Sequence, residues 1–163
     1  MNTINIEKLS REKFRPFGDI IETKSRQYEL INNNQCQKFN ELSTVKIKNN
    51  DPIAFSIFES QGKKLPIQLD FLEKHPLASQ AFMPLHYKQF LITVAEEYND
   101  RPANLKAFMT DGIQGININP NIWHGVLCPV PERGRFLVVD RLETKDNLQI
   151  FKFKEPFIID GQL

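Results

Sequence analysis

The fold of this chain is decided by two stretches of sequence: Glu73-Lys74-His75-Pro76-Leu77-Ala78-Ser79-Gln80-Ala81-Phe82-Met83-Pro84 and Gly115-Ile116-Asn117-Ile118-Asn119-Pro120-Asn121-Ile122-Trp123-His124. In both stretches, polar residues lie beside apolar residues typical of strands. Since residues i and i+2 of a strand project to the same face, Glu73 and His75 are expected to point together, and Trp123 and His124 to end a second strand. If the two strands pair or face each other, one carboxylate, two imidazoles and the Gln80 amide converge inside a β-barrel.

The composition excludes several classes of protein. A chain of 163 residues predicts a single domain, residues 1–163, large enough to bury a substantial core. The net charge of +1 does not favour a nucleic acid or an anionic membrane as partner. No apolar run is long enough to span a membrane, and the first nine residues lack the features of a signal peptide. Cys36 and Cys128 are expected to be reduced, which predicts a cytoplasmic protein.

The rest of the pattern is mostly that of short strands separated by turn-forming residues, which predicts a mainly β protein with a few short helices. The expected strands are residues 53–58, 90–95, 105–109, 115–118, 136–140 and 147–153. Residues 90–95 form a nearly continuous apolar run, which suits a strand buried on both faces. Two helical segments are expected, residues 10–17 with Ser10 as N-cap, and a turn or two within residues 68–74.

The candidate metal site consists of Glu73, His75, Gln80 and His124. A divalent metal needs three or four nitrogen or oxygen ligands in fixed geometry, and two imidazoles with a carboxylate suit nickel, zinc, manganese or iron. The spacing is similar to that of the cupin barrels, whose first motif supplies His-x-His and then Glu, and whose second supplies another His. Glu73 and His75 stand at the two His positions, Gln80 at the Glu position and His124 in the second motif. Because Gln is neutral, weak binding that is lost on purification is expected. Each His taken alone is more simply explained as a hydrogen-bonded core residue.

Candidate substrate-binding residues are Arg141, Lys88, Asn33, Asn117 and Gln80. Arg141 follows an apolar strand, where it either pairs with Asp140 or Asp19 or holds a substrate carboxylate. Lys88 also suits a charge at the end of a strand, and Asn32 to Asn34 also suit a turn, because Asn tolerates positive φ. His86 is expected to be exposed.

Five segments together resemble the ureidoglycolate lyase family of allantoin catabolism, in the order in which the family has them. They are Phe17-Gly18-Asp19-Ile20-Ile21-Glu22, Ile31-Asn32-Asn33, Leu72 to Pro84, Gly112-Ile113-Gln114-Gly115-Ile116-Asn117 with Trp123-His124, and Phe136-Leu137-Val138-Val139-Asp140-Arg141. The resemblance implies a cupin-like β-barrel (jelly roll), a homodimer, and a carbon–nitrogen lyase that cleaves ureidoglycolate to glyoxylate and urea. It also implies a possible nickel ion, since some family members are associated with that metal. The sequence departs from the family pattern at Asn34, where a Gly is usual, and after Trp123-His124, where Gly125 and Val126 follow.

The chemistry of such a substrate assigns roles to the candidate residues. We expect His124 or His75 to move protons, Glu73 to orient a His or a metal, and Arg141 or Lys88 to hold the carboxylate. Which His is the acid and which is the base is left open by the sequence. Two alternatives are a non-catalytic cupin that binds small carboxylic acids and a sugar-modifying cupin enzyme such as an isomerase.

Overall fold

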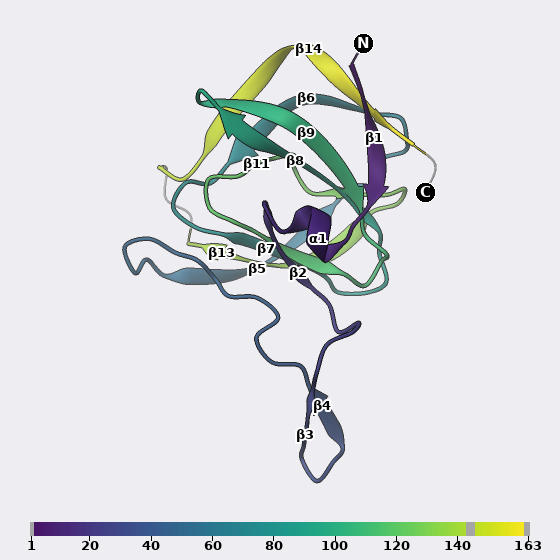
Figure 1. The fold of residues 1–163 in the computed structure, drawn as a ribbon, viewed down its shortest axis with the longest axis vertical. Coiled ribbons are helices and arrows are strands. Elements are labelled where there is room, and N and C mark those ends of the chain that lie inside the picture. Colours follow the sequence, from purple (N-terminus) through teal and green to yellow (C-terminus); the bar gives the residue numbers. More distant parts are fainter. Residues whose placement is uncertain (1, 143–145, 162–163) are drawn as a thin grey trace.

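A computed structural model describes residues 2–142 and 146–161, and nearly all of their regular structure is β-strand (Figure 1). The elements are, in chain order, β1 (Asn2–Lys8), α1 (Arg11–Phe14), β2 (Gly18–Ile21), β3 (Glu29–Ile31), β4 (Cys36–Lys38), β5 (Ile53–Ser60), β6 (Ile67–Lys74), β7 (Gln80–Pro84), β8 (Phe90–Tyr98), β9 (Arg101–Met109), β10 (Gly115–Ile118), β11 (Trp123–His124), β12 (Cys128–Pro129), β13 (Gly134–Arg141) and β14 (Gln149–Asp160). In the part of the chain that the structure describes, no helix is long and apolar enough to cross a membrane.

Two sheets build the barrel. The larger sheet has the order β11-β6-β14-β1-β9-β8-β12, and β11 also pairs with β8, so the strands from β11 round to β8 close into a ring. The second sheet has the order β2-β10-β7-β13-β5 and ends at β5 as an edge strand. The fold is the cupin-like β-barrel that the sequence predicted.

The two sheets enclose two hydrophobic cores that share strand β8. One core contains Ile92 and Val94 of β8 with Phe82, Phe136 and other residues of the second sheet. The other core lies inside the ring and contains Leu91 and Ala95 of β8 together with Trp123 and Leu72. Strand β8 is therefore buried on both faces, as its continuous apolar run predicted.

Most predicted strands are confirmed, and one predicted element is wrong. The six expected strands correspond to β5, β8, β9, β10, β13 and β14, although β14 begins at Gln149 rather than at residue 147. The expected helix after Ser10 is a single turn, α1, in which the Ser10 side chain accepts a hydrogen bond from Lys13 N. Residues 68–74 are not helical, because they lie in strand β6 and pair with β14.

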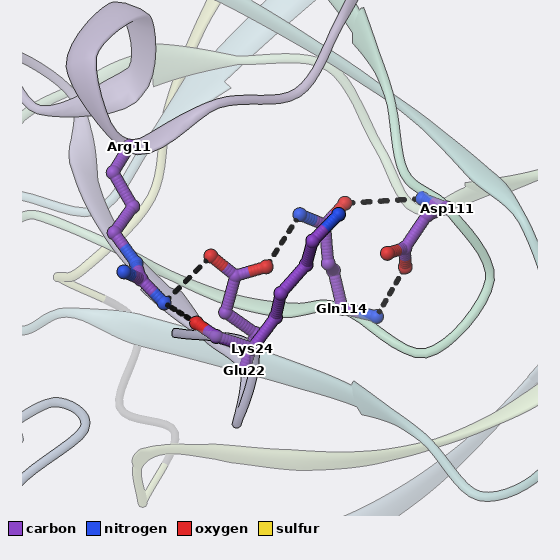
Figure 2. A network of polar contacts seen from close by, with 5 residues as sticks. All are labelled: Arg11, Glu22, Lys24, Asp111 and Gln114. Atoms are coloured by element: carbon purple, nitrogen blue, oxygen red, sulfur yellow. Dashed lines mark hydrogen bonds and ion pairs between the residues drawn. The ribbon is translucent and has the colours of Figure 1, made fainter. Parts of the chain in front are cut away.

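A network of polar side chains connects α1 to the barrel (Figure 2). Arg11 donates to the backbone oxygen of Lys24 at 2.6 Å and pairs with Glu22 at 2.9 Å. Gln114 donates to the other oxygen of Glu22 at 2.7 Å and accepts from the backbone nitrogen of Asp111 at 3.0 Å. Both carboxylate oxygens of Glu22 are engaged in this network, whereas the buried Nε of Arg11 has no described hydrogen-bond partner; since the contacts join α1 to the barrel, we assign the network a structural role.

The hairpin β3–β4 stands away from the barrel (Figure 1). The residues at its turn, Asn32, Asn33 and Asn34, all have positive φ, as the sequence predicted for a turn. At its base, the rings of Tyr28 and Phe39 contact each other with centroids 5.5 Å apart.

Candidate functional site

The two quoted stretches meet in the structure as the sequence predicted. Strand β11 runs antiparallel to β6, with His124 directly opposite Glu73 in the register. His75 follows the last residue of β6, and its ring lies 5.3 Å from that of His124. One carboxylate oxygen, Glu73 Oε1, lies 3.8 Å from His124 Nε2 and 4.0 Å from His75 Nε2.

In each of the two imidazoles, Nδ1 makes a hydrogen bond to a backbone oxygen, and Nε2 is the nitrogen that faces Glu73. His75 Nδ1 lies 2.7 Å from the backbone oxygen of Asn147, and His124 Nδ1 lies 2.9 Å from that of Ile122. A carbonyl oxygen only accepts, so each Nδ1 carries the hydrogen and each Nε2 presents a lone pair. Both Nε2 atoms are buried and have no hydrogen-bond partner among the described residues.

Burial shifts the pKa of both His124 and Glu73 toward the uncharged form of each group. It lowers the pKa of His124 to about 4, and the neighbouring His75 acts in the same direction. Burial also raises the pKa of Glu73 above its usual value, and His75 partly opposes that shift. At neutral pH, His124 is therefore a neutral imidazole.

The Glu73, His75 and His124 side chains fit a divalent metal ion. Their ligand atoms lie within 4.8 Å of one another, and all are acceptors. Metal–ligand bonds of about 2.1 Å allow separations of roughly 3–4 Å between the ligands of one ion, close to the distances observed here. Gln80 Oε1 is a further buried acceptor without a described partner. Gln80 Nε2 donates to Asp140 Oδ2 at 3.1 Å.

Two cavities meet at this cluster and share Glu73, Gln80 and Phe58 as walls. The first, which we call the polar cavity, has a volume of about 420 Å³ and is also lined by His75 and Arg141. The second, the side cavity, has a volume of about 470 Å³. It is further lined by the apolar residues Phe82, Val126 and Leu127 and by the polar residues Glu59, Ser60 and Gln61.

Arg141 lies at the polar cavity but is already engaged in an ion pair. Its Nε lies 2.7 Å from Asp51 Oδ2, so its ion-pair partner is Asp51 rather than Asp140 or Asp19, the two that the sequence suggested. Asp140 accepts from Gln80, and Asp19 accepts from Ser43. The pairing with Asp51 orients the guanidinium at the cavity wall.

The other three predicted substrate-binding residues lie elsewhere in the chain. Lys88 lies after β7 at the end opposite Gln80, with its Nζ 3.9 Å from Glu132. Asn117 donates to Ser43 Oγ and to the Thr44 backbone oxygen, both at 2.9 Å, and so holds the segment after the hairpin against β10. Asn33 is exposed in the hairpin turn, and His86 is exposed as expected.

Several residues that support the site were not singled out from the sequence. Asn147 orients His75 through its backbone oxygen and also accepts from Leu77 N at 2.8 Å through its side chain, so a loop residue fixes the His75 ring. Behind the cluster, buried Lys74 pairs with Glu97 and lies 4.6 Å from the centre of the Trp123 ring. Lys74 is the last residue of β6, a strand that also carries Asp70 and Glu73, so its charge did not single it out in the sequence.

Comparisons with known proteins point to one family. A family model described as ureidoglycolate lyase matches residues 1–160. The ureidoglycolate lyase of Rhodobacter capsulatus is 40% identical over 161 residues, covering 99% of this chain and 100% of that protein. That of Chelativorans sp. is 42% identical over 160 residues, covering 98% and 97%. That of Brucella anthropi is 38% identical over 156 residues, covering 95% and 92%.

Among solved structures, a dTDP-6-deoxy-D-glucose-3,5-epimerase from Legionella pneumophila aligns with a TM-score of 0.44 and 11% identity. The alignment covers 64% of this chain and 55% of that one. A likeness this distant does not bear on function.

We expect His124 to stay neutral well below the usual titration range of histidine. Because its pKa falls from 6.5 to about 4 on folding, the unfolded chain takes up a proton first as the pH drops. The contribution of His124 to stability is then present above pH 6.5 and lost as the pH falls toward 4. Nitrogen-15 NMR of chelator-treated protein should show the Nδ1–H tautomer at pH 5.5, with the signal assigned by its loss in His124→Gln. The urea-unfolded protein serves as control, in which the histidine should titrate with a midpoint at pH ~6.5. The same midpoint in the folded protein would contradict the assignment.

Proposed function

The chain belongs to the ureidoglycolate lyase family, and we propose that it cleaves ureidoglycolate to glyoxylate and urea. One carbon of this substrate carries a hydroxyl, a carboxylate and a ureido nitrogen. The observation that carries the proposal is the convergence of Glu73 with His75 and His124. The Nε2 atoms of the two histidines are buried acceptors without described partners. The substrate has the complementary groups, since its hydroxyl and its nitrogens all donate hydrogen bonds.

The reaction requires one proton to be removed and one to be delivered. The hydroxyl loses its proton, its oxygen forms a carbonyl bond to carbon, and the bond from that carbon to the ureido nitrogen breaks. The departing nitrogen takes up a proton, which completes urea, and the remaining fragment is glyoxylate. General acid–base catalysis of this kind typically contributes ~10²–10⁴-fold in rate.

We assign the proton transfers to the pair His75 and His124, whose Nε2 atoms are free to accept. One imidazole removes the hydroxyl proton, and the imidazolium that forms is stabilised by Glu73, 3.8 or 4.0 Å away. The same proton can then pass to the departing nitrogen. Asn147 and Ile122 keep the rings in the required orientation through their backbone oxygens.

Arg141 is the residue that we propose holds the substrate carboxylate, because among the described residues that line the polar cavity it is the one with a guanidinium or ammonium group. Asp51 fixes the guanidinium from one side at 2.7 Å. Lys88 pairs with Glu132 outside this cavity, so it has no part in the proposed reaction.

A bound divalent ion would be held by Glu73, His75 and His124, with Gln80 Oε1 as a further ligand. It would polarise the substrate hydroxyl and lower its pKa. With such an ion bound, the two imidazoles would serve as its ligands, and solvent would carry the protons in their place.

Replacing His124 with Ala should lower lyase activity by at least about 100-fold, because the variant lacks one of the two inward-facing nitrogens. The assay follows release of glyoxylate and urea from racemic ureidoglycolate, with circular dichroism to verify folding. His86→Ala is the matched control, since His86 is the third histidine and is exposed outside the cluster. A folded His124→Ala protein with full activity would refute the assignment.

Glyoxylate binding without turnover by the wild type would favour a binding module, and sugar turnover without urea release would favour an isomerase.

We expect any metal to be bound weakly, because Gln80 contributes no charge where the cupin motif has Glu. Dialysis against a chelator should remove the ion, and an activity that falls and then returns when nickel, manganese or zinc is added back would make Glu73, His75 and His124 metal ligands first. Elemental analysis before and after dialysis measures the occupancy. Unchanged activity in protein shown to contain no metal would mean that the side chains alone carry the reaction.

We also propose that the protein is a homodimer. Two apolar surfaces support this proposal: the outer face of edge strand β5, with Ile53, Phe55 and Ile57 exposed, and the β3–β4 hairpin with exposed Tyr28 and Leu30. Apolar patches larger than a few hundred Å² usually mark interfaces, and a two-fold dimer is the commonest assembly. A second copy could cover both surfaces at once.

Light scattering at micromolar concentration should give twice the chain mass of 19.0 kDa. Phe55→Asp should shift the mass toward the monomer, because Phe55 is 75% exposed in the single chain and would be buried in the dimer. Tyr98→Asp is the matched control, since Tyr98 is a similarly exposed aromatic residue, 71%, away from β5. A wild-type monomer would overturn the dimer.

We further propose a single domain, residues 1–163, in the cytoplasm. The two cores that share β8 support a single folding unit. The free thiols of Cys36 and Cys128 suit a reducing compartment.

A further inference from the structure

We propose that the site also cleaves ureidoglycolates that carry an alkyl or aryl group on the distal ureido nitrogen, and that the side cavity holds this group. The inference rests on the proposed lyase function and extends its substrate class. It starts from the two cavities that share Glu73, Gln80 and Phe58 as walls.

The direction of the substrate follows from charge. Its carboxylate belongs in the polar cavity with Arg141, and its reacting carbon lies beside Glu73. The ureido group then extends away from Arg141, past the shared wall of Glu73, Gln80 and Phe58. Beyond that wall lies the side cavity, so a substituent on the distal nitrogen enters it.

The side cavity is larger than the natural ureido group requires, and part of its wall is apolar. Its volume is about 470 Å³, whereas cavities of roughly 300–1,000 Å³ usually hold ligands much larger than this small acid. Two of its lining residues, Phe58 and Val126, are apolar yet 39% and 41% exposed. An apolar substituent would cover these two side chains and remove their surface from water.

The substituent leaves the chemistry unchanged, because it lies beyond the urea carbonyl from the bond that breaks. The hydroxyl proton is lost, the carbonyl of glyoxylate forms, and the carbon–nitrogen bond breaks. The departing nitrogen takes up the proton, so the products are glyoxylate and an N-substituted urea.

The test compares ureidoglycolate with its N′-methyl and N′-benzyl derivatives, prepared by condensing glyoxylate with the substituted urea. Glyoxylate release measures kcat and KM for each on the wild-type protein. We expect the benzyl derivative to be cleaved with a KM about fivefold lower than that of ureidoglycolate, because its ring is buried against apolar side chains.

Val126→Trp tests where the substituent lies. The larger side chain should lower kcat/KM for the benzyl derivative at least about tenfold relative to ureidoglycolate in the same variant. The ratio of the two substrates cancels any general loss of folded protein. Leu85→Trp is the control, because Leu85 is exposed next to the other end of β7, and it should leave the ratio unchanged.

Turnover of ureidoglycolate without binding or turnover of the derivatives would overturn the inference and leave the lyase function standing. Equal loss for both substrates in Val126→Trp would also overturn it, since the substituent would then lie elsewhere. No turnover of ureidoglycolate itself would instead refute the function on which the inference rests.

Discussion

The site depends on the pairing of strand β11, only two residues long, with both β6 and β8. Adjacent residues of a strand point to opposite faces, so Trp123 enters the core of the ring while His124 faces Glu73. Two contacts fix the Trp123 indole: its Nε1 donates to Glu97 at 3.1 Å, and Lys74 lies over its ring. A one-residue slip of β11 would place the indole in the site and the imidazole in the core.

This arrangement buries more acceptors than the surrounding protein can satisfy. Three atoms, His75 Nε2, His124 Nε2 and Gln80 Oε1, are buried without a described partner. Buried polar atoms without partners destabilise a fold by about 1–3 kcal/mol each, which makes their presence in one cluster a feature of function rather than of stability. A cation or a donor-rich substrate satisfies them, and the lowered pKa of His124 keeps a proton from doing so at neutral pH.

Much of the fold and part of the site were readable from the sequence, and the failures have physical causes. Alternation and turn residues identified strand β10 to the residue, and the spacing of Glu73 with His124 predicted their convergence. Strand β6 was misread because its buried positions change face between Leu69 and Leu72. The register with β14 shifts at the same place, and the resulting spacing of three resembles a helix.

The remaining failures concern contacts between distant segments. The Asn147 backbone oxygen orients His75 from a loop. Every residue has a backbone oxygen, so the pattern of side chains in the sequence could not predict this contact. Arg141 finds Asp51, 90 residues away in the chain, rather than its neighbour Asp140. Asp140 instead accepts from Gln80, and both Asp140 and Arg141 line the polar cavity.

Asp140 also explains why the chain has Gln80 where the cupin motif has Glu. The Gln80 amide donates to the Asp140 carboxylate at 3.1 Å, so a Glu at this position would set two carboxylates against each other. Only one of them could then ionise readily, as in other like-charged pairs at about 3 Å. The amide avoids that repulsion and uses its nitrogen to bind Asp140. Its oxygen is thereby left as an acceptor, which retains a ligand atom at the motif position and shifts the negative charge to the neighbouring strand β13.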